Sequence, residues 1–256
     1  MLKKKIITNT SFNVLAQILQ FCFGIVLARL LIPNDFGVYG ISLLIIETSL
    51  LFTLKGFSTA LIQAKEVTDK HFKIAFAINL VISILLIFVV CISANALGDF
   101  FHMPLLPSLL RWQVCALFVM AFEVVSTVKL LRETKFKELG ISLMASVFAN
   151  GVVSILFIIL KFGAMSLVFG YLAEAMVRVL ICLRYGNFKL PVAPQASNSR
   201  SFGKLFSVGF GVSLQQIFNH FAANVDYFWL GRLTNATELG LYTRAYRIMS
   251  VPIRQV

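Results

Sequence analysis

Carboxylates lie within strongly apolar stretches of this sequence, where a charged group is costly to accommodate. The set comprises Glu47, Glu123, Glu174 and Asp226. The three glutamates fall about eleven to fifteen residues into their stretches, which in a helix places them near mid-membrane. A buried carboxylate can carry a proton or hold Na⁺, so all four are candidate ion-coupling residues. The alternative is neutralisation by a neighbour, as for Glu174 with Arg178 one helical turn away.

Amide side chains follow one face of two apolar stretches. In the first stretch they recur with helical spacing, at Asn13, Gln17 and Gln20. A later stretch carries Gln215, Gln216, Asn219, His220 and Asn224. Two interpretations remain open: a face that binds the hydroxyl groups of a ligand, or hydrogen bonds between packed helices.

The elements that position these groups are predicted to be transmembrane helices. Hydrophobic residues make up 59% of the 256 residues and charged residues 13%, with a mean hydropathy of +0.87. A soluble domain has roughly 45–50% apolar and about 25% charged residues. Apolar runs of about twenty residues recur, the length that spans a bilayer. We predict an all-α polytopic membrane protein with spans near 10–32, 36–62, 73–98, 108–129, 139–160, 163–184 and 205–231, and another beginning near 238.

The net charge of +12 lies mainly between the apolar runs. Such charges fix membrane topology rather than bind nucleic acid. Their alternation predicts a cytoplasmic N-terminus and a cytoplasmic linker at 185–203, which is rich in Pro, Ser and Asn. The histidines and cysteines form no metal-binding pattern, so no cofactor or structural metal is expected. No loop carries an Asp-x-Asp or paired-His motif, which argues against a membrane enzyme.

An internal repeat relates two distant parts of the chain. Residues 27–40 (LARLLIPNDFGVYG) align without a gap to residues 230–243 (LGRLTNATELGLYT). Six predicted spans separate the copies, so both units have the same orientation, as in two-bundle transporters. We therefore predict a six-helix bundle at 1–184, the linker at 185–203, and the start of a second bundle at 204–256, with the chain truncated within that second unit.

The same two segments resemble the polysaccharide transporter family, the oligosaccharide-lipid flippases of the MOP superfamily. The resemblance extends over the whole chain, and is strongest to members that handle colanic acid, other exopolysaccharides or O-antigen. It implies a bacterial inner-membrane protein that moves undecaprenyl-pyrophosphate-linked glycans to the periplasmic leaflet by ion-coupled alternating access. The implied partners are the lipid-linked oligosaccharide, H⁺ or Na⁺, membrane lipids and a polysaccharide polymerase.

The resemblance also gives the deep polar residues expected roles. Lys55 and Arg178 are the deeper cations, and we hypothesise that they bind the pyrophosphate head group. The amide faces would bind sugar hydroxyls. At the helix ends, Arg29 and Arg232 are more simply interpreted as carbonyl caps or as bridges to Asp35 and Glu238. The alternative functions are a MATE-like exporter of cationic drugs and an inactive truncated fragment.

Overall fold

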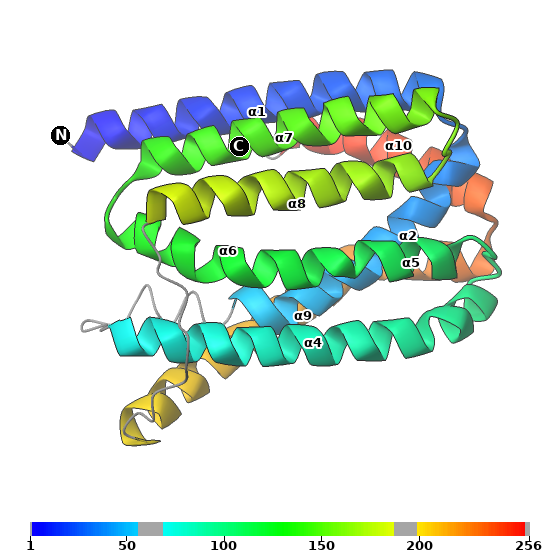
Figure 1. Cartoon of the computed structure of the whole chain (residues 1–256). Helices are drawn as coiled ribbons and strands as arrows, with labels where there is room; N and C mark the ends of the chain where they lie inside the picture. The colour runs from blue at the N-terminus through cyan, green and yellow to red at the C-terminus, as the bar shows by residue number, and fades with distance from the viewer. Residues whose placement is uncertain (1, 56–68, 187–198, 254–256) are drawn as a thin grey trace.

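The computed structural model describes residues 2–55, 69–186 and 199–253, and these ranges contain no β-strand. Most helices run side by side, and their connections gather at two opposite ends of the molecule (Figure 1). The elements are α1 (Leu2–Leu30), α2 (Pro33–Leu50), the π-helix η1 (Leu51–Lys55), α4 (Asp69–Phe100), α5 (Leu106–Gln113), α6 (Cys115–Arg132), α7 (Phe136–Ile159), α8 (Met165–Gly186), α9 (Ser199–Leu233) and α10 (Ala236–Ile253). The predicted all-α class is confirmed.

Several helices are long and apolar enough to cross a membrane. Among the described residues these are Thr10–Leu30, Pro33–Thr53, Ala75–Phe100, Leu106–Arg132, Phe136–Ile159 and Met165–Gly186. Their outward surface is apolar. On α4, more than half of each of these side chains is exposed: Val81, Ile84, Leu85, Phe88 and Ile92. Such a stripe is unfavourable in water and favourable in lipid, so the chain is a multi-pass membrane protein.

The interior of the bundle carries small polar side chains instead of a purely apolar core. The serines that are at most 1% exposed are Ser42, Ser83, Ser126, Ser142, Ser146, Ser154 and Ser166. Some are satisfied within their own helix: Ser42 Oγ donates to Tyr39 O at 2.8 Å and Ser146 Oγ to Leu143 O at 2.9 Å. Small side chains let helix backbones approach closely. This close packing favours helix association in a membrane, where apolar side chains gain little by leaving the equally apolar lipid.

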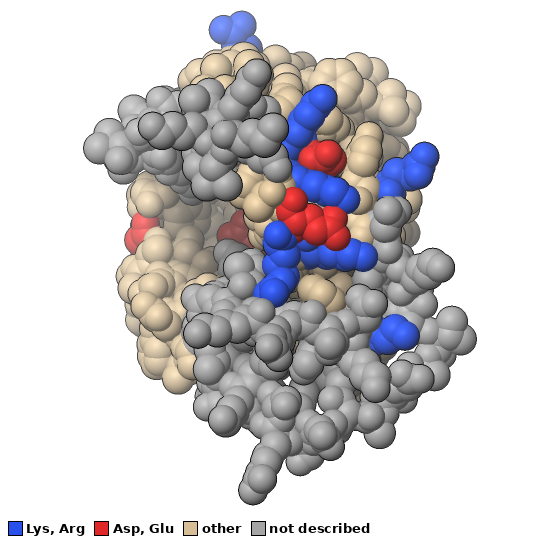
Figure 2. All heavy atoms as spheres, turned by 90° about the vertical axis from the view of Figure 1, so that its left-hand side faces the viewer, with Lys and Arg blue, Asp and Glu red and all other residues tan. Residues whose placement is uncertain are grey.

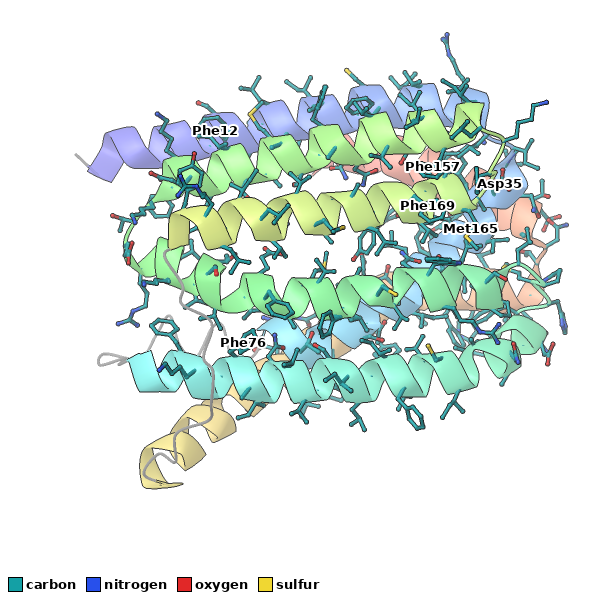
Figure 3. All side chains as sticks on the ribbon, in the orientation of Figure 1. Phe12, Asp35, Phe76, Phe157, Met165 and Phe169 are labelled. Carbon is teal, nitrogen blue, oxygen red and sulfur yellow. The ribbon has the colours of Figure 1, made fainter. Side chains whose placement is uncertain are left out.

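Helix α1 is fixed on α7 by two phenylalanines that pack onto glycines. A Cβ added to Gly140 would lie 2.5 Å from the Phe12 ring, and one added to Gly151 would lie 2.3 Å from the Phe23 ring. Both pairs are three helical turns apart along two helices that run in the same direction (Figure 1; Phe12 is labelled in Figure 3). The matched spacing sets the register of α1 against α7.

The turns after α4, α6 and α7 share one backbone motif. Each has a non-glycine residue at positive φ, namely His102 (55°), Thr134 (54°) and Lys161 (64°). After α7, Phe162 N–H donates to Phe157 O and Lys161 N–H to Ile158 O, the hydrogen-bond pattern of a Schellman motif. Glycine is the residue that normally occupies this left-handed position, because a Cβ there is strained.

Replacing Lys161 by glycine is therefore expected to stabilise the fold. The left-handed conformation costs a non-glycine residue about 1–2 kcal/mol. An added glycine gives the unfolded chain an entropic advantage of about 0.4–1 kcal/mol, so the free energy of unfolding should rise by up to about 1 kcal/mol. The measurement is the thermal unfolding temperature of the detergent-solubilised chain. Lys137, which is exposed and lies in the helical backbone of α7, provides the control. Lys137→Gly should lower stability by about 1 kcal/mol, and equal effects of the two changes would contradict the strain argument.

Helix boundaries differ from the prediction in instructive places. The second span was expected to begin at residue 36, but Pro33 is the first residue of α2, where its missing N–H costs nothing. The span predicted at 108–129 is made of α5 and α6, which meet at Val114. Of the predicted linker, residues 187–198 lie outside the described residues, and the division into two bundles stays a prediction.

The two copies of the repeat pack directly against each other, through α2 and α10. A Cβ on Gly37 would lie 1.8 Å from Ala236 O, and a Cβ on Gly240 would lie 1.8 Å from Pro33 O. In the repeat alignment Pro33 matches Ala236 and Gly37 matches Gly240, so the two contacts are reciprocal. A Cβ on Gly40 would lie 3.3 Å from Thr243 Oγ1, and these two positions are also equivalent. A two-fold axis passing between the copies gives this pattern.

Basic side chains concentrate at one end of the molecule. The start of α4, the connection from α6 to α7 and the end of α8 lie at the left in Figure 1, and Figure 2 views this end with its Lys and Arg gathered around a few carboxylates. These segments carry Lys73, Lys129, Arg132, Lys135, Lys137 and Arg184. The turns at the opposite end carry fewer basic residues. This asymmetry is the one from which the sequence predicted the orientation in the membrane.

Candidate functional site

Helix α8 lies between α6 and α7 and brings together the deepest charged residues (Figure 1). The close approach to α7 depends on Gly170, because a Cβ there would lie 1.9 Å from Ser154 Oγ. One helical turn further along α8 stands Glu174, and a second turn further stands Arg178. The sequence therefore places an acid and a base on a helix that has polar neighbours on both sides.

Arg178 forms an ion pair with α6, not with its own helix. Its Nε lies 2.8 Å from Oε1 of Glu123. The Arg178 side chain is 37% exposed and the Glu123 side chain 11% exposed, so the carboxylate is the buried partner. The alternative considered for Glu174, neutralisation by Arg178 one turn away, is not the observed pairing, because α6 offers Arg178 a carboxylate across the helix interface.

Glu174 is held by α7. Its Oε2 accepts a hydrogen bond of 2.5 Å from Asn150 Nδ2, and Asn150 Oδ1 in turn accepts one of 3.2 Å from Ser154 Oγ. Asn150 is a mid-span amide that the sequence argument missed. Its presence inside an apolar stretch was the signal that could have identified it.

The three glutamates predicted to lie at mid-span converge on one phenol. Tyr171, on α8, lies within the electrostatic reach of Glu47, Glu123 and Glu174. Its hydroxyl also donates a weak hydrogen bond to Met120 Sδ at 3.9 Å. Three helices thus bring a carboxylate to the same region, and we call Glu47, Glu123, Glu174, Tyr171 and Arg178 the central cluster.

The fourth carboxylate lies elsewhere. Asp226, on α9, accepts a hydrogen bond from the Tyr242 hydroxyl of α10. Tyr242 belongs to a group of aromatic rings with Tyr227 and Tyr246, whose centroids lie 5.3–6.0 Å apart. Asp226 is therefore part of the contact between α9 and α10 and not of the central cluster.

The predicted amide faces are accessible. On α1, Gln17 and Gln20 are exposed and Asn13 is half-buried; on α9, Gln215 and Asn219 are exposed. Their backbones belong to helices, as expected, and exposure leaves the side chains free to meet a ligand or lipid. Lys55 ends the π-helix η1, but its side chain lies outside the described part of the chain.

At the end opposite the basic residues, the helix-end arginines make different contacts from those expected. Arg232 Nη1 lies 2.8 Å from His102 Nε2, and its guanidinium lies 5.0 Å from the centroid of the Phe100 ring. The predicted carbonyl cap or bridge to Glu238 is wrong, because the Arg232 guanidinium contacts His102 in the turn after α4 and the Phe100 ring instead. Arg29 is exposed at the end of α1.

Asp35 joins this end of the molecule to α8. Its carboxylate accepts a hydrogen bond from the backbone of Ala164, immediately before α8, and Figure 3 shows it beside Met165 and Phe169. A carboxylate at a helix N-terminus is favourable because the helix dipole is positive there. Arg244 lies within electrostatic reach of Asp35 and donates to Leu31 O at 2.7 Å, with its guanidinium 4.6 Å from the Phe36 ring. Asp35, which the repeat alignment pairs with Glu238, thus has a structural role here.

A pocket of about 590 Å³ opens at the same end, between the turns that follow α1, α4 and α9. Its polar lining includes Asn34, His102, Asn235 and Glu238. It lies at the helix ends and is separate from the central cluster.

Comparison with known proteins places the chain in a functional context. Residues 26–256 match the family described as polysaccharide biosynthesis protein. The chain is 23% identical over 261 residues to the lipopolysaccharide biosynthesis protein WzxC of Escherichia coli, covering 98% of this chain and 52% of that protein. It is 24% identical over 256 residues to the succinoglycan biosynthesis transport protein ExoT of Rhizobium meliloti, covering 97% of this chain and 51% of that protein.

A third relative is the teichuronic acid biosynthesis protein TuaB of Bacillus subtilis, 22% identical over 202 residues, with 78% of this chain and 41% of that protein covered. The chain spans about half the length of the curated relatives that it matches. No solved structure matches the chain.

Proposed function

The chain belongs to the polysaccharide transporter family, and from this premise we propose that it functions as a flippase for lipid-linked oligosaccharides. The substrate is a glycan on undecaprenyl pyrophosphate, which moves from the cytoplasmic to the periplasmic leaflet of the bacterial inner membrane. The relatives named for lipopolysaccharide, succinoglycan and teichuronic acid support a surface polysaccharide as the product.

Arg178 is the observation that carries the proposal. It is a cation on a membrane-spanning helix, its partner Glu123 is buried, and its own side chain is 37% exposed. A flippase must stabilise a negatively charged head group on its way through a low-dielectric layer. An accessible arginine at this depth supplies that positive charge, with Lys55 as the second proposed cation.

We assign ion coupling to the carboxylates. Glu47, Glu123 and Glu174 all lie within electrostatic reach of Tyr171, and carboxylates that share one region repel each other unless a proton or a cation joins them. Such a group is suited to take up H⁺ or Na⁺ during alternating access. Asp226 is a separate candidate in the second repeat unit, where Tyr242 is its partner.

The glycan itself would meet the amide faces. Asn13, Gln17 and Gln20 on α1 and Gln215 and Asn219 on α9 offer both donors and acceptors to sugar hydroxyls. The basic end of the molecule is proposed to face the cytoplasm, with the N-terminus, because Lys and Arg are retained on that side. A polysaccharide polymerase is the proposed partner that receives the product.

One observation favours a second candidate. The central cluster holds three carboxylates and one arginine, so it is acidic on balance, which suits a cationic drug and hence a MATE-like exporter. The two functions differ in which compound accumulates when transport stops.

Deletion of the gene that encodes this chain is expected to raise the level of one polyprenyl-linked oligosaccharide in the cell. Mass spectrometry of extracted lipids measures the change, and the mass identifies the glycan. Re-expression of the gene should return the lipid to its wild-type level. An unchanged lipid pool together with increased sensitivity to cationic drugs would reject the flippase in favour of the exporter.

A further inference from the structure

The Arg178 guanidinium pairs with Glu123 through its Nε, which lies 2.8 Å from Glu123 Oε1. The Arg178 side chain is 37% exposed, whereas the Glu123 side chain is 11% exposed. The two terminal nitrogens of a planar guanidinium form a fixed pair of donors that matches two oxygens of a phosphate. The exposed part of the Arg178 side chain therefore allows a phosphate contact while Nε stays paired with Glu123.

Glu123 is itself fixed. The residue is 9% exposed, and Thr127 Oγ1, one turn along α6, donates to its Oε1 at 3.4 Å. The backbone of Arg178 is tied to α7, because Ser142 Oγ donates to Arg178 O at 3.5 Å. Three helices thus define where both partners of the ion pair lie.

An unsupported arginine has many rotamers and loses them when it binds a ligand. Contact between Nε and a fixed carboxylate removes much of this freedom before the ligand arrives, and it leaves the Nη edge directed away from Glu123. The carboxylate also compensates the charge of Arg178 when no ligand is bound, which limits the cost of keeping a cation at this depth.

Given the proposed function, on which this inference rests, we propose that Glu123 is a positioning residue that presents the Nη edge of Arg178 to an anionic pyrophosphate head group. Glu123 thereby has a positioning role in addition to the proposed coupling role that it shares with Glu47 and Glu174. The head group is recognised by its phosphate oxygens and not by its lipid or its sugar.

The test is equilibrium binding of geranylgeranyl pyrophosphate to the detergent-solubilised chain, with geranylgeraniol as the probe that lacks phosphate. Glu123→Leu and Arg178→Leu should each raise the dissociation constant for the pyrophosphate about tenfold, since each removes a charge-assisted contact. Glu123→Gln keeps an acceptor for Nε and should change it by no more than about threefold. None of the three substitutions should alter the dissociation constant for geranylgeraniol.

The double variant Glu123→Leu with Arg178→Leu separates positioning from folding. It removes both charges, so it should elute and unfold like the wild type while it still binds the pyrophosphate weakly. Loss of Glu123 should not weaken binding further when Arg178 is already absent. The inference is overturned if Glu123→Leu binds as tightly as the wild type, or if it lowers affinity by the same factor in both backgrounds.

The two proposals fail differently. If the wild type does not prefer the pyrophosphate to the alcohol, the anionic substrate and thus the proposed function is rejected. If the wild type shows the preference and the variants at Glu123 do not weaken it, only the positioning role is rejected.

Discussion

Gly37→Leu is expected to separate the two repeat units. A Cβ at this position would lie 1.8 Å from Ala236 O, which belongs to the backbone of α10 and cannot rotate away. Overpacking against a rigid neighbour costs about 3 kcal/mol. For a chain of this length, this corresponds to a decrease of roughly 6–12 °C in thermal unfolding temperature. The detergent-solubilised chain, followed by a thermal melt, gives the measurement.

Gly24→Leu is the matched control, because no atom lies within 4 Å of a Cβ built there and Gly24 is also helical. Its unfolding temperature should stay within about 2 °C of the wild type, as for most surface changes.

A cysteine pair at Gly40 and Thr243 checks the contact independently and should form a disulfide on mild oxidation, since the two side-chain positions are in contact. Equal effects of the two leucines, with no cross-link, would refute the reciprocal packing of α2 and α10.

Arg178→Leu should abolish transport, with at least a hundredfold loss of rate, since no other described side chain offers a guanidinium in the central cluster. A lost charge-assisted contact accounts for about tenfold, and an unpaired Glu123 left at the site repels the head group further. Arg178→Lys keeps the charge but not the paired donors, and should retain about a tenth of the rate. The assay is the lipid-linked glycan level in deletion cells that express each variant.

Arg111 supplies the control for this prediction. It is exposed near the opposite end and donates to Asn95 Oδ1 at 2.8 Å, so Arg111→Leu should transport normally. Each variant must also reach the membrane in wild-type amounts, because removing one partner of the ion pair leaves the other charge uncompensated and can destabilise the fold. If the combined Lys55→Ala and Arg178→Ala variant is fully active, neither residue is needed for substrate binding, and their proposed role is rejected.

Local sequence patterns predicted the first six spans well because hydrophobic length is a property of each segment alone. The spans predicted at 205–231 and from near 238 correspond to α9 and α10, which are not among the membrane-spanning candidates found in the described residues. The convergence of Glu47, Glu123 and Glu174 on Tyr171 was beyond that approach. It depends on how each helix is rotated, and the rotation is set by contacts such as Gly170 against Ser154. Periodicity within one helix also suggested the wrong partner for Arg178, since the helical spacing to Glu174 is visible in the sequence and the proximity of Glu123 is not.

The repeat illustrates the same limit. The alignment of 27–40 with 230–243 predicted two units of equal orientation, but it did not predict that the copies would touch. Gly37 and Gly240 could have been the signal, because a glycine inside a predicted span usually marks a close helix approach. The interaction of Asp35 with the start of α8 was equally hidden, since 129 residues separate Asp35 from Ala164.

The reciprocal contact between α2 and α10 has an evolutionary consequence. A surface that pairs with its own copy needs only one gene, so a single ancestral unit could have formed this contact as a homodimer. Duplication and fusion then place both halves in one polypeptide, and every later mutation alters one half of the contact instead of both. Gly40 faces Thr243 at equivalent positions, so the ancestral residue has since been replaced on at least one side.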